Sequence, residues 1–207
     1  SSSEFLLGLI NDMLDISRIE SGNLNLKSEQ MSREMFGTAI NTTIGPLMEQ
    51  KNITFRCDLQ HMEEMIYTDA VRFKQIFFNL LSNAAKYTPA GGNVWLLTER
   101  LRTEGNVEWV RFTVRDSGIG MSEEFLEHAF EPFSQEGNRT LALQWQGTGL
   151  GLAIVKKLVV MMHGTIEIHS KLGEGTEVIL DLPLTISGVD APEKMPQAVM
   201  AKQNLEG

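Results

Sequence analysis

Two amides, an ammonium and a phenol recur at helical spacing near the middle of the chain. Asn79, Asn83, Lys86 and Tyr87 are offset by four, seven and eight positions from the first of them, so a helix would place them on one stripe. An amide oxygen can ligate Mg²⁺, which prefers oxygen ligands, and a lysine ammonium can neutralise a phosphate. The stripe fits a metal–nucleotide site, and it equally fits the solvated face of an ordinary amphipathic helix.

Two glycine patterns further along the chain favour the first interpretation. Residues 116–121, Asp-Ser-Gly-Ile-Gly-Met, follow a predicted strand directly, and the Asp116 carboxylate could accept a hydrogen bond from an exocyclic amine such as that of adenine. The alternative interpretation of residues 116–121 is a plain turn. Residues 147–152, Gly-Thr-Gly-Leu-Gly-Leu, open a predicted helix. The free backbone N–H groups at a helix start form an anion site.

Three better-known phosphate motifs are excluded by what surrounds these glycines. A dinucleotide fingerprint needs a strand immediately before it, whereas residues 144–146 resemble a loop. A P-loop is excluded because no Gly-Lys-Ser/Thr follows. Arg115-Asp116 is not the catalytic loop of eukaryotic-type protein kinases, since Ser117 comes next and no suitably spaced Asn follows.

Composition places the chain among globular proteins and narrows its partners. It has 207 residues, of which 42% are hydrophobic and 22% charged. A net charge of -9 argues against nucleic acid as the main partner. A single cysteine, Cys57, excludes an internal disulfide framework. We find no apolar run of about 20 residues and no signal peptide, so we expect no membrane contact by this chain.

Hydrophobic periodicity predicts helices alternating with short strands. Helices are expected over residues 5–21, 32–48 and 69–88, in a short segment after Ser122, and over 149–162. Strands are expected over residues 24–27, 53–57, 65–67, 94–102, 107–115, 165–170 and 176–182. Residues 131–146 are polar and weakly patterned, which predicts a lid-like loop. The expected fold is α+β: a two-layer sandwich in which helices cover one face of a mixed sheet.

Five of these patterns, in this order, resemble the conserved boxes of one enzyme family. Residues 79–89, 116–120, 130–133, 147–152 and 173–176 are similar to the N, G1, F, G2 and G3 boxes of the sensor histidine kinase catalytic domain. The resemblance spans about residues 24–183. Residues 9–22 also resemble the second helix of that family's dimerisation and phosphoacceptor hairpin.

The resemblance implies three segments and a role for each matched residue. Residues 1–22 would be the remnant of a hairpin helix, residues 23–184 the ATP-binding domain, and residues 185–207 a linker whose end resembles the lead-in to a receiver domain. Asn83 would hold Mg²⁺, Lys86 would contact phosphate, Tyr87 would lie against adenine or ribose, and Asp116 would read the adenine amine. Further ATP contacts are expected at Gly118, Gly120, Met121, Phe130, Arg139, Gly147, Thr148, Gly149, Leu150, Gly151, Leu152 and Thr176. Phe130 and Phe133 are expected to anchor the lid by packing.

Asn79 separates relatives within the wider superfamily. Gyrase-like and MutL-like ATPases place a Glu there as a general base for water, and an amide lacks that basicity. The resemblance therefore implies phosphoryl transfer to a histidine, with Asn79 and Lys86 as catalytic residues. Two alternatives remain open: an ATPase that drives conformational change, which fast ATP hydrolysis would favour, and a degenerate ATP-binding scaffold, which a failure to bind Mg-ATP would favour.

No histidine of the chain has the sequence context of a phosphoacceptor. His61, His128, His163 and His169 all lack the expected His-Glu-apolar-basic setting. We therefore expect the acceptor on a hairpin helix outside this chain, and we expect the chain to bind ATP without phosphorylating itself. Implied partners are that dimerisation domain, within a homodimeric parent, and the receiver domain of a response regulator. The implied location is cytoplasmic, with a parent that could be membrane-anchored.

Overall fold

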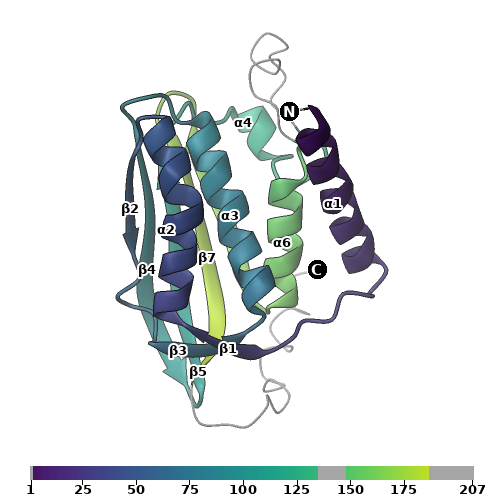
Figure 1. The fold of residues 1–207 in the computed structure, drawn as a ribbon, viewed down its shortest axis with the longest axis vertical. Helices are drawn as coiled ribbons and strands as arrows, with labels where there is room; N and C mark the ends of the chain where they lie inside the picture. The colour runs from purple at the N-terminus through teal and green to yellow at the C-terminus, as the bar shows by residue number, and fades with distance from the viewer. Residues whose placement is uncertain (1, 135–147, 187–207) are drawn as a thin grey trace.

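The computed structural model describes residues 2–134 and 148–186 (Figure 1). The helices are α1 (Ser2–Glu20), α2 (Arg33–Gln50), α3 (Ala70–Tyr87), α4 (Glu123–Leu126) and α6 (Gly151–Met161). The strands are β1 (Glu29–Ser32), β2 (Thr54–Asp58), β3 (Met65–Thr68), β4 (Asn93–Glu104), β5 (Val107–Asp116), β6 (Thr165–Lys171) and β7 (Gly175–Ile186).

The strands form one mixed sheet with helices α2, α3 and α6 side by side on one face (Figure 1). The strand order is β1-β3-β7-β5-β4-β2, and β6 pairs with β7. β2 runs parallel to β4, whereas the other pairs are antiparallel. The expected two-layer α+β sandwich is confirmed.

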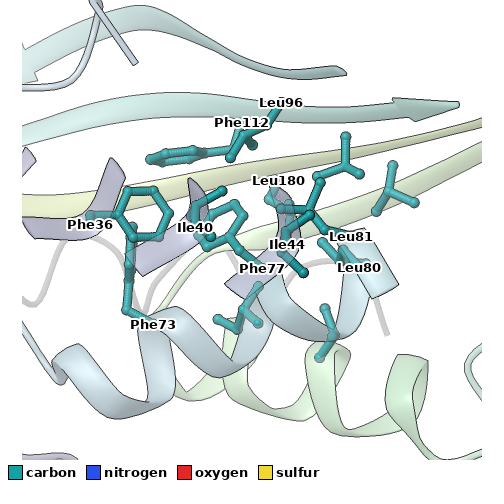
Figure 2. Close-up of a cluster of buried hydrophobic side chains, with 14 of the residues drawn as sticks. Phe36, Ile40, Ile44, Phe73, Phe77, Leu80, Leu81, Leu96, Phe112 and Leu180 are labelled. Carbon is teal, nitrogen blue, oxygen red and sulfur yellow. The ribbon is translucent and has the colours of Figure 1, made fainter. Parts of the chain in front are cut away.

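An aromatic cluster packs α3 against its neighbour α2 and against the sheet beneath both helices. Phe73 and Phe77 of α3 contact Phe36 of α2 and Phe112 of β5, with ring centroids 4.9–5.7 Å apart and mostly edge-to-face (Figure 2). All four rings are fully buried. Such pairs stabilise beyond their buried area. The helix that carries the polar stripe is therefore fixed by its opposite, apolar face.

Side-chain caps begin α2, α3 and α4 where the sequence predicts them. Asp69 Oδ1 accepts from the Arg72 amide at 3.0 Å at the start of α3. Ser32 Oγ accepts from the Met35 amide at 3.0 Å at the start of α2, and Ser122 caps α4 in the same way. Each cap satisfies an amide that the helix itself leaves without an acceptor.

Replacing Ser32 by Ala is expected to lower the free energy of unfolding by about 1 kcal/mol, because the first turn of α2 loses its cap. Urea denaturation followed by circular dichroism measures the change. Ser28→Ala, at an exposed position just before β1, is the matched control and should leave the midpoint unchanged. Equal midpoints for the two variants would show that the cap is not stabilising.

Two strand predictions were wrong. Residues 24–27 alternate like a strand but form none, since the Leu24 amide bonds back to Arg18 O and the Lys27 amide donates to Asp69 Oδ2. Strand β1 lies further along, at Glu29–Ser32. The last strand also continues past Pro183 to Ile186. Pro183 falls between the part of β7 that pairs with β6 and the part that pairs with β3. On that side of β7 no neighbouring strand therefore needs an N–H donor at position 183.

Helix α1 lies against α6 and leaves an apolar face exposed. Asp15 accepts from Arg72 at 3.0 Å and from Gln75 at 2.7 Å, both on α3, and Glu20 pairs with Lys157 of α6 at 3.2 Å. The exposed apolar side chains are Leu6, Leu7, Ile10, Met13 and Leu14. Within the described residues, no helix is long and apolar enough to cross a membrane.

Candidate functional site

The two amides of the stripe face the start of helix α6. A Cβ added at Gly151 would lie 3.5 Å from Asn79 Oδ1 and 3.8 Å from Asn83 Nδ2. Among the described residues no side chain caps α6, whose N-cap position is Leu150. The second glycine pattern and the stripe thus meet, because the side chains of Asn79 and Asn83 lie next to the first residue of α6.

The end of α3 meets the first glycine pattern through its backbone. The Ile119 amide donates to Tyr87 O at 3.1 Å. A Cβ at Gly118 would lie 2.5 Å from Tyr87 O and 2.7 Å from Asp116 Oδ1, so only glycine fits. The Lys86 ammonium lies 4.7 Å from the centre of the Tyr87 ring. The hydrogen bond between Ile119 and Tyr87 therefore joins the helix that carries the stripe to the loop after β5.

Asp116 is a buried carboxylate held by backbone donors. It is 8% exposed, and its Oδ1 accepts from the Gly118 amide at 2.8 Å. Burial raises the pKa of Asp116, while hydrogen bonds from the Gly118 and Thr176 amides oppose that rise. Its position at the end of a central strand fixes an acceptor at the inner edge of the site.

A third glycine pattern, residues 173–176, packs closely against the first, residues 116–121. A Cβ at Gly120 would lie 1.9 Å from Lys171 O, and one at Gly175 would lie 2.0 Å from Asp116 O. Both residues have positive φ, 67° and 91°. Ser170 Oγ accepts from the Met121 amide at 2.9 Å and lies 2.7 Å from Thr176 Oγ1. Thr176 and Met121 are therefore joined by one hydroxyl beside Asp116.

The second glycine pattern also connects to helix α1 and to Phe133, in the first part of the predicted lid. Thr148 Oγ1 donates to Asp12 Oδ2 at 2.9 Å and accepts from the Leu150 amide at 3.2 Å. Burial raises the pKa of Asp12, which this hydrogen bond partly offsets. Gly149 O accepts from the Phe133 amide at 2.9 Å. The Phe133 ring is 59% exposed, so within the described residues its backbone makes the link and the predicted ring packing is not seen.

The remaining predicted residues are placed less centrally. The Phe130 ring lies under the Lys156 ammonium of α6 at 4.9 Å. Leu150 is fully buried, and Leu152 packs against the core. Arg139 and Gly147 lie outside the described residues. His128 and His169 each pair with a glutamate on the surface.

Sequence reasoning missed three residues that contact the site. Asp12 and Ser170 bond to predicted site residues from distant segments, and Lys51 donates to Ala85 O and Lys86 O at the end of α3. Neither helical nor glycine periodicity could find them, because each contact joins residues that only the fold brings together. The hydroxyl of Ser170, on a strand next to a Gly-x-Gly-Thr turn, was the one local signal available.

A family profile matches the same part of the chain that builds this site. The profile described as "Histidine kinase-, DNA gyrase B-, and HSP90-like ATPase" matches residues 68–186, from the end of β3 to the end of β7. The chain belongs to this ATPase family. The matched region contains the polar stripe and all the glycine patterns.

Curated relatives of this ATPase family member are sensor kinases and related proteins. The chain is 39% identical over 184 residues to the "Non-motile and phage-resistance protein" of Caulobacter vibrioides, covering 89% of this chain and 22% of that protein. It is 37% identical over 187 residues to the "Autoinducer 2 sensor kinase/phosphatase LuxQ" of Vibrio vulnificus, with 89% and 22% coverage. It is 34% identical over 195 residues to the "Sensor histidine kinase RcsC" of Escherichia coli, with 94% and 20% coverage. The chain thus spans about one fifth of the length of these relatives.

Solved structures of histidine kinases share the fold. Full-length ShkA, crystallised in complex with AMPPNP, superposes with a TM-score of 0.75 and 29% identity over 91% of this chain and 38% of that chain. The histidine kinase AdeS of Acinetobacter baumannii gives a TM-score of 0.65 over 90% of this chain and 81% of that chain. At 22% identity, the second match is a likeness of fold alone.

Proposed function

We propose that the chain binds ATP with Mg²⁺ and supplies the γ-phosphoryl group to a histidine on a dimerisation helix outside this chain. The observation that carries the proposal is the contact of Asn79 and Asn83 with the start of α6. The end of the same helix α3 contacts the loop formed by Asp116, Gly118 and Gly120, which we call the Asp116 wall. Membership of the ATPase family and the sensor kinases among its relatives support the same activity.

The described residues fit an adenine nucleotide. A side chain at Gly118 or Gly120 would collide with neighbouring backbone. The two glycines therefore allow the loop after β5 to pack closely beside Asp116. A buried carboxylate at the end of that wall suits an amine donor such as adenine N6. Thr176, joined to Ser170, would support the same end. ShkA, which has this fold, was crystallised with an ATP analogue.

The two amides fit a hard divalent cation at the opposite end. Asn83, whose side chain lies beside Gly151, would supply an oxygen to Mg²⁺, and the backbone amides at the start of α6 would bind the phosphates. When bound, the cation would neutralise charge on the phosphates. Lys86 would add a positive charge there, and Tyr87 would lie against adenine or ribose.

The residues of this chain would favour transfer over hydrolysis. The resemblance places Asn79 where gyrase-like ATPases have a Glu that acts as general base, and an amide can orient a group but cannot take its proton. Positioning and charge neutralisation then account for the rate. The proposed partners are the phosphoacceptor hairpin and, downstream, a receiver domain, in keeping with relatives named as sensor kinases.

The test is transfer to a separate acceptor. We expect this chain, mixed with labelled Mg-ATP and a polypeptide that carries the complete dimerisation hairpin of a relative, to put acid-labile, base-stable phosphate on the hairpin and none on itself. A hairpin whose acceptor histidine is replaced by Gln is the control. Phosphate on this chain alone, or fast ATP hydrolysis without transfer, would contradict the proposal.

A further inference from the structure

The carbonyl groups at the end of α3 receive hydrogen bonds from two other parts of the fold. The last carbonyls of a helix lack partners within it and must bond elsewhere. Tyr87 O accepts from the Ile119 amide of the first glycine pattern at 3.1 Å. Ala85 O and Lys86 O both accept from one ammonium, that of Lys51, the latter at 3.2 Å.

Lys51 reaches this position from the end of the neighbouring helix. It is the C-cap residue of α2, and its own amide bonds back to Leu47 O at 3.3 Å. The following turn is tied to the loop after α3, because the Gly91 amide donates to Asn52 O at 2.7 Å. Burial, and the nearby charge of Lys86, lower the pKa of Lys51. The ammonium is thus held by both helices beside a second positive charge.

We infer that Lys51 is a positioning residue for the nucleotide site, an inference that rests on the proposed function. Its ammonium donates to the carbonyls of Ala85 and Lys86, which belong to the peptide groups on either side of Lys86. The next carbonyl, that of Tyr87, accepts from the Ile119 amide in the loop after Asp116. A cation at the negative end of a helix is also electrostatically favourable. Lys51 therefore sets how Lys86 faces the bound nucleotide, without itself contacting that nucleotide.

The clamp also explains how the site tolerates two lysines close together. Two ammonium groups repel each other, so a free Lys51 ammonium would push the Lys86 side chain away from its position. Lys51 directs its charge at carbonyl oxygens, whereas Lys86 lies over the Tyr87 ring at 4.7 Å. Each ammonium therefore has a partner of its own. Lys86 remains on the stripe of α3 that carries Asn79 and Asn83.

Calorimetric titration of Lys51→Met with Mg-AMPPNP, well below the melting temperature of the variant, tests the inference. We expect the Kd to rise about fivefold to tenfold, since a charge-assisted clamp is lost while every proposed contact residue remains. Lys51→Arg should recover most of the affinity, because it keeps both charge and donors. Lys27→Met removes an exposed charge near the opposite end of α3 and should bind like the wild type.

A double-mutant cycle separates positioning from stability. If Lys51 acts through Lys86, then Lys51→Met should change the Kd by less than twofold in a Lys86→Met background. Unchanged binding by Lys51→Met, or an equal loss in both backgrounds, would overturn the inference. If Lys51→Met does not fold, Lys51→Gln and the Arg variant supply the same comparison. A wild-type chain that fails to bind Mg-AMPPNP would instead refute the proposed function.

Discussion

Replacing Asp116 by Asn is expected to weaken ATP binding roughly 10- to 150-fold, the effect of losing one hydrogen bond to a charged acceptor. The carboxylate is buried at the end of β5 and already accepts from the Gly118 amide at 2.8 Å. An Asn amide would keep one oxygen for that bond, but its NH₂ group would meet other donors, including the adenine amine. Isothermal calorimetry with Mg-AMPPNP measures the loss.

The pH dependence of wild-type binding tests the same carboxylate independently. Burial raises the pKa of Asp116, so protonation begins at a higher pH than for an ordinary Asp. Affinity should therefore fall as the pH decreases through that raised pKa, and the fall should be absent in Asp116→Asn. Binding by the variant with wild-type affinity and the same pH profile would rule out Asp116 as the adenine acceptor.

Asp181→Asn is the matched control for this prediction. Asp181 lies on the adjacent strand β7 and accepts two hydrogen bonds from Arg111, both at 2.8 Å. This substitution removes a carboxylate from the same sheet and is expected to change stability without changing the Kd for nucleotide. A comparable loss of affinity in both variants would mean that sheet stability, and not adenine recognition, explains the result.

Replacing Asn83 by Ala is expected to abolish the Mg²⁺ dependence of nucleotide binding and to weaken Mg-ATP binding by about 10- to 100-fold. The Asn83 side chain, on α3, lies near the start of α6, with its Nδ2 3.8 Å from the position of a Cβ on Gly151. Its oxygen is the one we assign to the cation, so its removal leaves the phosphates to Lys86 and backbone amides. Titrations of AMPPNP with Mg²⁺ and with EDTA measure the effect.

Asn41→Ala supplies a helical amide outside the site. Asn41 is exposed on α2, so its removal should leave both titrations unchanged. If Asn83→Ala retains the wild-type difference between Mg²⁺ and EDTA, the cation is held by other groups. If it loses affinity equally under both conditions, Asn83 contacts the nucleotide directly.

Much of the fold could be predicted because its signals are local. Capping residues such as Ser32 and Asp69 set the helix starts, and apolar spacing along α3 put Asn79 and Asn83 on the free stripe. Glycines marked the loops because a side chain at Gly118 or Gly120 would collide with backbone from another segment. The glycines around Asp116 could therefore be predicted from the sequence.

The errors arise where tertiary contacts override local patterns. Residues 24–27 have the alternation of a strand, but Asp69 takes the Lys27 amide that a ladder would need. Pro183 is compatible with β7 because of where its two neighbouring strands end, which no local rule contains. Lys51 contacts the end of α3 across 34 positions of sequence. Long side chains that bond to distant backbone leave no periodic signal.

The most direct test of the common nucleotide site is an NMR titration of the isotope-labelled chain with Mg-AMPPNP. The account predicts saturable shifts, with one Kd, at the side-chain amides of Asn79 and Asn83 and at the backbone amides of Gly118 and Gly151. Shifts confined to one of these two groups, or no saturation at millimolar nucleotide, would contradict it.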